Sequence, residues 1–316
     1  MADSVFNTKY NEIISVIQSD FEKLDCEITS YFEKQKTDNS QIIPIIKEFI
    51  NNKGKRLRPA LIFLWAKALN KKEDKFYTKI AMANELLHNA TLIHDDIIDC
   101  SLLRRGQKTL NFDYDSKLAV LAGDFLIAQV LNLLFDIEDK NIRETHSQAV
   151  SNLINGELYQ YFNRYKLLSI DKYIEKSKDK TARLFEAGLV STYTYDNQDI
   201  KNKEEVKNFA LNFGTAFQII NDIENFNDTQ KVDEDIQNGD YSAPFIYYVQ
   251  EKYQGDLTKI KNIKLISKHI KESNAIEKTK QLAKYFLNRA IENTSFLEDN
   301  QYKRAIIDLC NLLSGK

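Results

Sequence analysis

Three aspartates in the first third of the chain, Asp95, Asp96 and Asp99, have the spacing of a metal-binding motif. The residues before them, 85–94, repeat apolar side chains every three to four positions, which predicts a helix. On a helix Asp95 and Asp99 lie one turn apart on the same face, with Asp96 beside them. Carboxylates together with phosphates are ligands that Mg²⁺ prefers. The motif therefore predicts a Mg²⁺ site, and a solvated acidic helix end is the alternative when the motif is considered alone.

Two adjacent arginines, Arg104 and Arg105, follow the aspartates after a short interval. The guanidinium group binds phosphate oxygens through two parallel hydrogen bonds. A diphosphate needs such cations on one side and metal ions on the other. At this spacing from the aspartates, the arginine pair indicates a diphosphate-binding site rather than an ordinary basic turn.

The elements that position these residues are predicted to be helices. Apolar residues recur at three- and four-residue spacing along most of the chain, and alternating strand patterns are scarce. We expect an all-α protein of roughly ten or more helices, forming a single domain over residues 1–316. Polar breaks separate the expected helices at 51–55, 70–75, 104–109, 136–141, 195–203, 225–241 and 253–258. Only the break at 225–241 exceeds an ordinary loop, and loops of this length are often lids over a site.

Composition excludes several classes of protein. The 44 basic and 46 acidic residues give a net charge of −2, which provides no general attraction to nucleic acid or to an anionic membrane. The 3 cysteines are far apart, which favours a reducing compartment over a disulfide framework. We expect a cytoplasmic protein, since the N-terminus has no signal-peptide pattern. The most apolar stretch, Ala119–Phe135, is interrupted by Asp124 and predicts a buried core helix rather than an integral membrane segment.

With these motifs in order, the sequence resembles the trans-type polyprenyl diphosphate synthases, which are head-to-tail prenyltransferases. The resemblance extends from about residue 50 to residue 250. The matching stretches are GKRLRP (54–59), ELLHNATLIHDDIID (85–99), SLLRRGQKT (101–109), LAGDFL (121–126), GELYQ (156–160), KTARLF (180–185), FGTAFQIINDIEN (213–225) and KVDEDIQNGDYSAPFIYY (231–248).

This resemblance implies an all-α isoprenoid synthase fold, in which helices surround a central hydrophobic cavity with two aspartate-rich motifs at its mouth. It implies a homodimer and a Mg²⁺-dependent reaction. In that reaction an allylic diphosphate ionises, the double bond of isopentenyl diphosphate attacks, and a proton is lost.

The resemblance also implies a role for individual residues. The isopentenyl diphosphate site is expected at Lys55, Arg58, His88 and Arg105. The allylic diphosphate is expected at Arg104, Lys180 and Lys231. The metal ligands are expected to be Asp95, Asp96, Asp99 and Asp222. Thr181 and Gln218 match positions whose hydroxyl and amide dipoles can stabilise a developing cation, and with Lys180 and the first-motif aspartates they complete the expected catalytic set.

The sequence departs from the family pattern in the second acidic motif. Two carboxylates are replaced by amides at Asn221 and Asn225, which can still bind Mg²⁺ through oxygen but add no negative charge. We expect weaker binding of a third metal ion. Asp240 stands where many members have lysine, and Lys231 lacks its usual preceding glycine.

Small residues before the first motif favour a long product. In this family bulky aromatic residues one turn before the motif close the product tunnel, whereas here Ala90 and Thr91 occupy these positions. We expect a product longer than farnesyl, with Leu86 and Leu87 as the floor of the tunnel. Close helix packing is the structural alternative for Ala90.

Two alternative functions stay open. The altered second motif, with Thr229 following, partly resembles that of a class I terpene synthase, but such an enzyme has no isopentenyl diphosphate to bind at Lys55, Arg58, His88 and Arg105. A catalytically weak subunit of a heteromeric synthase is the other alternative. Such subunits usually lose the first motif, which is intact here.

Overall fold

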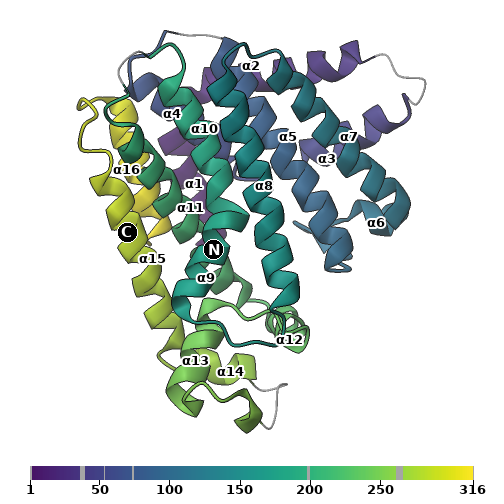
Figure 1. The fold of residues 1–316 in the computed structure, drawn as a ribbon, viewed down its shortest axis with the longest axis vertical. Helices are drawn as coiled ribbons and strands as arrows, with labels where there is room; N and C mark the ends of the chain where they lie inside the picture. The colour runs from purple at the N-terminus through teal and green to yellow at the C-terminus, as the bar shows by residue number, and fades with distance from the viewer. Residues whose placement is uncertain are drawn as a thin grey trace.

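The computed structural model describes residues 2–35, 40–52, 54–72, 75–197, 200–260 and 266–315, apart from the side chains of 2–4 and 229–231. The described part is almost entirely helical, which confirms the all-α prediction (Figure 1). The α-helices are α1 (Ala2–Ile14), α2 (Gln18–Lys34), α3 (Ile42–Asn51), α4 (Leu57–Ala68), α5 (Lys75–Ile98), α6 (Leu110–Asp113), α7 (Ser116–Phe135), α8 (Lys140–Phe162), α9 (Ile170–Ser177), α10 (Arg183–Thr194), α11 (Lys203–Asn225), α12 (Thr229–Gln237), α13 (Ala243–Tyr253), α14 (Ile266–Lys271), α15 (Ala275–Glu292) and α16 (Gln301–Leu313).

Three short helices and one hairpin complete the described structure. The 3₁₀ helices are η1 (Ser15–Ile17) and η3 (Leu257–Lys259), and the π-helix is η2 (Lys178–Ala182). Strands β1 (Leu103–Arg104) and β2 (Gln107–Lys108) pair antiparallel, with Leu103 opposite Lys108 and Arg104 opposite Gln107.

Polar side chains fix the start of several helices. Asp115, Asp139, Ser169 and Asn300 each precede a helix and accept hydrogen bonds from backbone N–H groups in its first turn. Such caps satisfy donors that have no partner within the helix, and each contributes about 1 kcal/mol. Of these four caps, only Asp139 lies in a predicted break, that at 136–141, and the breaks before α7, α9 and α16 were not predicted.

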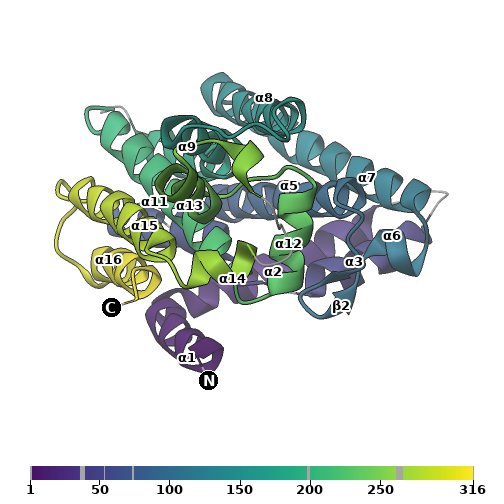
Figure 2. The same ribbon diagram turned by 90° about the horizontal axis from the view of Figure 1, so that it is seen from below.

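Helix α5, which carries the first acidic motif, runs through the middle of the helices (Figure 2). It contacts α2, α4, α6, α7 and α10. Its central residues 80–87 are all buried, and the small side chains of Ala81 and Ala83 allow neighbouring helices to approach closely. The motif at its C-terminal end is therefore held by a rigid, buried element.

Buried apolar residues form one large core cluster and a smaller one. The smaller cluster joins Phe226, Val232 and Ile236 to α13 and α14, which extend beyond the main body in Figure 1. Helix α12 lies inside the segment 225–241, which was expected to be a loop, so that expectation is wrong for Thr229–Gln237. Val232 and Ile236, one turn apart, supply the buried face that makes this segment helical.

Helix α7 is long and apolar enough to span a membrane by length and composition alone, and 44% of its most apolar window is buried. One face, including Ala119, Leu126 and Val130, is buried in the core. The opposite face is exposed at Leu121 and Phe135. The prediction of a buried core helix is therefore correct for one face only.

Candidate functional site

Two pockets lie against α11, one lined by residues of α5 and the other by Asp99, which directly follows α5. The first, the cationic pocket, has a volume of about 620 Å³ and is lined by Asn7, Tyr10, Asn11, Gly54, Lys55, Arg56, Leu57, Arg58, Glu85, His88, Leu92, Arg104, Arg105, Phe217 and Asn221. The second, the acidic pocket, has a volume of about 170 Å³ and is lined by Asp99, Gln160, Tyr173, Lys176, Ser177, Lys180, Gln218, Asp222, Asn225, Phe226, Val232, Asp235, Ile236, Asp240, Tyr241 and Ser242.

The cationic pocket brings together all four residues expected to bind isopentenyl diphosphate, Lys55, Arg58, His88 and Arg105. Two structural features make this possible. Arg105 has a left-handed backbone (φ 52°) in the β1–β2 turn, so that its side chain reaches the segment after α3 and donates to Asn52 O at 2.8 Å. A side chain at position 54 would overlap the Arg105 guanidinium, which explains the glycine of the GKRLRP motif.

Burial in the cationic pocket disfavours positive charge that has no counter-ion. Burial lowers the pKa of Arg58 to about 10, although the nearby Glu85 carboxylate opposes this shift. Burial and the neighbouring arginines also hold the pKa of His88 well below its usual range, so its imidazole is neutral. The Arg58 Nε has no hydrogen-bond partner among the described residues. An anion in this pocket would satisfy these groups.

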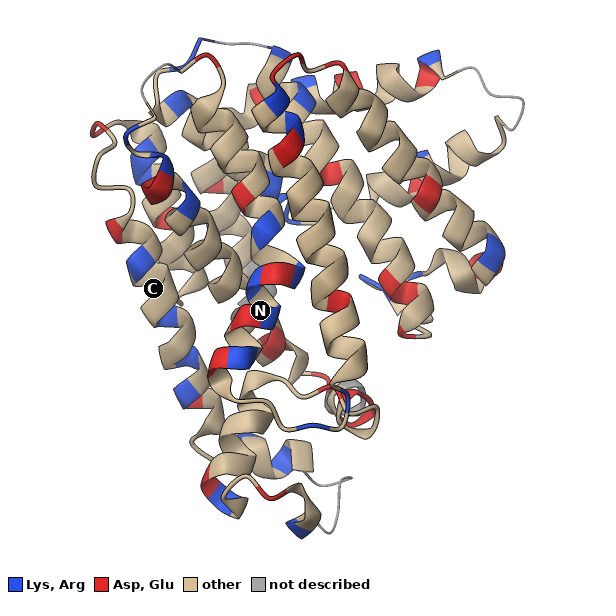
Figure 3. Ribbon diagram, viewed as in Figure 1, with Lys and Arg blue, Asp and Glu red and all other residues tan. Residues whose placement is uncertain are grey.

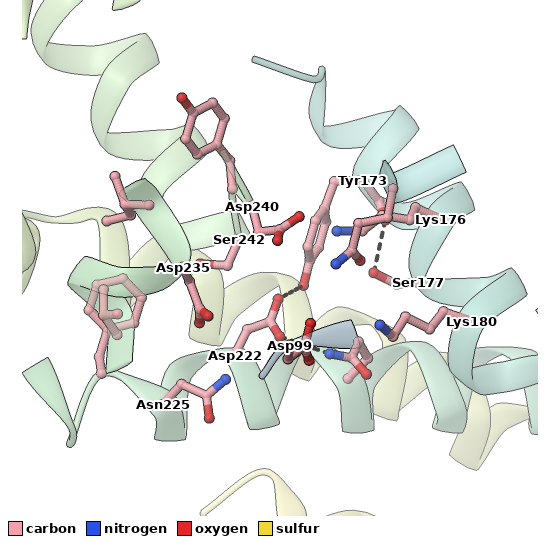
Figure 4. A pocket seen from close by; sticks show the side chains of 16 residues that line it. Asp99, Tyr173, Lys176, Ser177, Lys180, Asp222, Asn225, Asp235, Asp240 and Ser242 are labelled. Atoms are coloured by element: carbon pink, nitrogen blue, oxygen red, sulfur yellow. Dashed lines mark hydrogen bonds between the residues drawn. The ribbon is translucent and has the colours of Figure 1, made fainter. Parts of the chain in front are cut away.

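The acidic pocket is lined by Asp99 of the first motif and by Lys180 of the π-helix η2 (Figure 4). Lys180 lies on η2, and its Nζ is 2.7 Å from the Glu157 carboxylate on α8. Burial raises the pKa of Asp95 to about 7; Lys180 opposes this effect, while Glu157 and Asp99 add to it. The Asp95 carboxylate is therefore in an environment that favours an additional cation.

Two glycines allow the neighbouring helices to close on η2. A Cβ on Gly156 of α8 would lie 2.9 Å from Lys180 N, and one on Gly214 of α11 would lie 2.5 Å from Ala182 Cα. Close approach on both sides brings Glu157 to Lys180 and Gln218 to Thr181. A π-helical turn is often found at a functional site, where it changes which side chains face inward.

A chain of hydrogen bonds crosses the acidic pocket. The Thr181 hydroxyl donates to Gln218 Oε1 at 2.7 Å, and Gln218 Nε2 donates to Asp222 Oδ1 at 2.8 Å. The Tyr173 hydroxyl donates to Asp222 Oδ2 at 2.6 Å (Figure 4). The predicted pair Thr181 and Gln218 is therefore in contact, and Asp222 is held in place by two protein donors.

Asp96 differs from the other first-motif aspartates because it is buried and paired with Arg104. Arg104 Nε lies 2.8 and 2.9 Å from its two oxygens, and Nη2 lies 2.7 Å from one of them. Asp96 was predicted to bind metal and Arg104 to bind diphosphate, and in the structure the two side chains form an ion pair with each other. In this arrangement Asp96 orients Arg104 toward the cationic pocket.

The donor set was tested for its fit to a divalent metal ion. Among the described residues, no three His, Cys, Asp or Glu side chains are close enough together to hold a metal ion. Asp95 and Asp99 are near each other, and burial raises the pKa of Asp95 to about 7, an effect to which the Asp99 carboxylate adds. Their hard oxygen donors, next to a pocket large enough for phosphate, fit Mg²⁺ when it arrives with substrate phosphates and waters.

Several residues of the acidic pocket were missed by sequence reasoning. Glu157, the partner of Lys180, stands in the GELYQ motif. This motif was recognised in the sequence, but no chemical role was predicted for its residues. Tyr173 and Lys176 lie on α9, outside the recognised motifs. Asp240, expected to repel a diphosphate, is paired instead with Arg164 at 3.4 Å. The side chain of Lys231 lies outside the described residues.

The four residues expected to set product length lie on the α5 turns before the motif. Ala90, Leu86 and Leu87 are buried, and Thr91 is half-buried with its hydroxyl donating to His88 O. Their predicted role as tunnel lining and floor stays a prediction.

Comparisons with known proteins agree on one family. Residues 39–285 match the family described as Polyprenyl synthetase. A prenyl transferase from Cyanidium caldarium is 32% identical, over 87% of this chain and 89% of its own length. The all-trans-nonaprenyl-diphosphate synthase (geranyl-diphosphate specific) of Rhodobacter capsulatus is 29% identical, over 95% of this chain and 96% of its own length.

A solved structure shows the same fold. Polyprenyl synthase from Caulobacter crescentus CB15, complexed with calcium and isoprenyl diphosphate, superposes with a TM-score of 0.86 at 24% identity, covering 97% of this chain and 98% of its own. The likeness confirms the predicted isoprenoid synthase fold. Together with the family match over most of the sequence, it leaves neither of the alternative functions favoured. The chain belongs to the polyprenyl synthetase family of prenyl transferases.

Proposed function

We propose that this chain extends an allylic diphosphate by head-to-tail addition of isopentenyl diphosphate, in a Mg²⁺-dependent reaction. The observation that carries the proposal is the gathering of Lys55, Arg58, His88 and Arg105 in one pocket, directly across α11 from the acidic pocket. Phe217 and Asn221 face one pocket, and Gln218 and Asp222 face the other. One diphosphate substrate can therefore bind on each side of the same two turns of α11.

The cationic pocket suits isopentenyl diphosphate because its charges need no metal. Arg58 and Arg105 offer guanidinium donors, and Lys55 adds an ammonium group whose nearest carboxylate, on Glu224, is 3.9 Å away. Neutral His88 can donate one ring N–H without adding a charge. A terpene synthase would have no use for this set, which argues against that alternative.

The acidic pocket suits the allylic diphosphate. Asp95 and Asp99 would hold Mg²⁺, with Asp222 on the opposite wall, and Lys180 would bind the diphosphate directly. When bound, Mg²⁺ would supply Lewis-acid stabilisation of the leaving diphosphate. The Thr181 hydroxyl and the Gln218 amide would place fixed dipoles beside the developing allylic cation. Arg104, which is held by Asp96 and lines the cationic pocket, would reach an oxygen of the allylic diphosphate from that side.

The product is proposed to be longer than C15. Small side chains at Ala90 and Thr91 support this proposal, because no bulky aromatic side chain stands at these positions to close a product tunnel. The similarity to a nonaprenyl-diphosphate synthase over nearly the whole chain also supports it.

We further propose that the protein is a single-domain subunit of a cytoplasmic homodimer. Large apolar residues are exposed on α7 and α8, at Leu121 (62%), Phe135 (76%), Ile154 (53%) and Phe162 (69%). Figure 3 shows that these two helices carry few charged residues. A second copy of this face is the proposed cover, since exposed apolar patches of this kind mark protein interfaces. Sedimentation of the purified protein tests the dimer, and a monomer at all concentrations would exclude it.

Product analysis tests the proposed reaction. Purified protein is incubated with Mg²⁺, isopentenyl diphosphate and separate allylic primers of increasing length, and the products are resolved by mass. We expect elongation that requires isopentenyl diphosphate, with products beyond C15. A hydrocarbon or alcohol formed without isopentenyl diphosphate would show a terpene synthase instead, and no product with any primer would indicate a missing partner subunit.

A further inference from the structure

Lys176 is a lysine of the acidic pocket that the proposed mechanism does not use. It lies on the last turn of α9, one turn before Lys180, and both side chains line the pocket (Figure 4). Lys180 is paired with Glu157 at 2.7 Å. Lys176, in contrast, has no carboxylate within 4.0 Å among the described residues, and its Nζ lies 5.6 Å from the centre of the Tyr173 ring.

The nearest carboxylates already have other partners. Asp222 accepts hydrogen bonds from Tyr173 and Gln218, and Asp240 is paired with Arg164. Burial lowers the pKa of Lys176, an effect that Asp222 and Asp240 oppose. An ammonium group has three donors and no acceptor, so a half-buried one without a partner carries an energetic cost. An anionic ligand in the pocket would remove that cost.

The second acidic motif gives this lysine a reason to be present. Asn225 lines the same pocket as an amide, where the family pattern has a carboxylate. The α11 side of this pocket therefore binds metal ions less strongly, and gains less positive charge from them, than it would with a carboxylate at position 225. An ammonium group on the facing α9 wall supplies one positive charge that does not depend on a metal.

We propose that Lys176 binds the diphosphate of the allylic substrate and supplies part of the positive charge that the amide at position 225 does not recruit. This inference rests on the proposed function, because it assumes that the acidic pocket holds the allylic diphosphate. It adds a substrate-binding residue from α9 to the set predicted from the sequence motifs.

The test measures binding rather than turnover. Calorimetric titration uses a farnesyl thiolodiphosphate, which binds like the allylic substrate but resists ionisation, and isopentenyl diphosphate is titrated separately. Lys176→Met keeps the apolar stem and removes the charge, and Lys176→Arg restores a cation. Lys172→Met is the matched control, since Lys172 is exposed on the preceding turn of α9 and paired with Glu175.

We expect Lys176→Met to weaken binding of the thiolodiphosphate by about tenfold or more, as for the loss of a charge-assisted hydrogen bond. Lys176→Arg should recover most of that loss, and Lys172→Met should bind as the wild type does. Isopentenyl diphosphate should bind to all variants equally. Lys176→Gln provides a second neutral variant if the thermal melt shows that Met destabilises the fold.

Three results would overturn the inference. If neutral variants bind the thiolodiphosphate as tightly as the wild type, Lys176 does not contact the diphosphate. If binding of both ligands falls equally, the lysine has a structural role only. If the wild type itself binds isopentenyl diphosphate but not the thiolodiphosphate, the assignment of the acidic pocket fails, and with it the proposed function.

Discussion

Replacing Arg105 by alanine should selectively weaken the use of isopentenyl diphosphate. Arg105 forms part of the cationic pocket, and among the described residues its guanidinium donates one hydrogen bond to protein, from Nη1 to Asn52 O. The guanidinium therefore retains further donors for a ligand. Its charge lies near Arg58, whose pKa it helps to lower, so removing it relieves repulsion in the unliganded protein. The folded state should tolerate the change.

The size of the effect follows from the interactions lost. A hydrogen bond to a charged group contributes about 1.5–3 kcal/mol, which corresponds to about a 10- to 150-fold change in an equilibrium constant. We expect KM for isopentenyl diphosphate to rise within this range in the Arg105→Ala variant. The KM for the allylic primer should change by less than about threefold, because Arg105 does not line the acidic pocket.

Steady-state kinetics with radiolabelled isopentenyl diphosphate, varying each substrate in turn, measures both constants. Lys108→Ala is the matched control, since Lys108 lies on the same hairpin with a side chain that is 59% exposed and pairs with Asp113 at 3.3 Å. An unchanged KM for isopentenyl diphosphate would refute the assignment of the cationic pocket. A change confined to the allylic primer would show that the two diphosphate sites are interchanged.

Four further predictions concern the acidic pocket and the helices around it. Asp95→Asn should abolish turnover and flatten the pH dependence of stability. Because the pKa of Asp95 is about 7 in the folded state and 3.8 in the unfolded state, the wild type loses stability as pH rises through this range. Thermal melts without metal should therefore show that the variant is more stable than the wild type above pH 7. A variant that melts like the wild type at every pH would contradict this. Gly214→Ala should lower the free energy of unfolding by about 1–3 kcal/mol in urea, because its Cβ would lie 2.7 Å from Ala182 Cβ; an unchanged midpoint would show that α11 can move away from η2. Tyr173→Phe should cost about 1–3 kcal/mol by the same measurement, since a buried Asp222 oxygen loses its donor, and no loss would mean that another donor replaces the hydroxyl. Asn225→Asp should lower the Mg²⁺ concentration needed for half-maximal turnover, because Asn225 lines the acidic pocket. Asn221 lines the cationic pocket instead, so Asn221→Asp should leave that concentration unchanged. Equal effects of the two substitutions would place both residues at one metal site.

Local sequence patterns were sufficient to predict most of the fold and half of the site. Helical periodicity and polar breaks predicted many of the helices, and the predicted break at 136–141 contains the cap Asp139. The breaks capped by Asp115, Ser169 and Asn300 were not predicted, although each of these side chains also acts on the turn that follows it. Lys55, Arg58, His88 and Arg105 of the cationic pocket were predicted together, since each stands in a recognised motif, whereas Tyr10 of the same pocket lies outside the motifs. Helix α12 was missed because its buried face consists of two residues, Val232 and Ile236, whose partners lie on α13 and α14.

Contacts between distant segments could not be predicted from the same patterns. Glu157 meets Lys180 only because Gly156 allows α8 to approach η2, and no spacing rule connects positions 157 and 180. Tyr173 reaches Asp222 from a different helix. Arg104 and Asp96 were predicted as two separate ligands because their motifs have separate chemical uses, whereas burial of Asp96 requires a charged partner nearby.

The charges of the two pockets support the proposal that a metal ion is needed on one side of α11 only. In the cationic pocket, Arg58 and Arg105 share a single buried carboxylate, that of Glu85, and Arg56 is held by Asp25 at 2.6 Å. A diphosphate entering this pocket meets excess positive charge. In the acidic pocket, the carboxylates among the described lining residues, Asp99, Asp222, Asp235 and Asp240, outnumber the ammonium groups of Lys176 and Lys180. A diphosphate entering there without an additional cation would be repelled, and this arrangement of charge around one helix supports the proposed requirement for Mg²⁺.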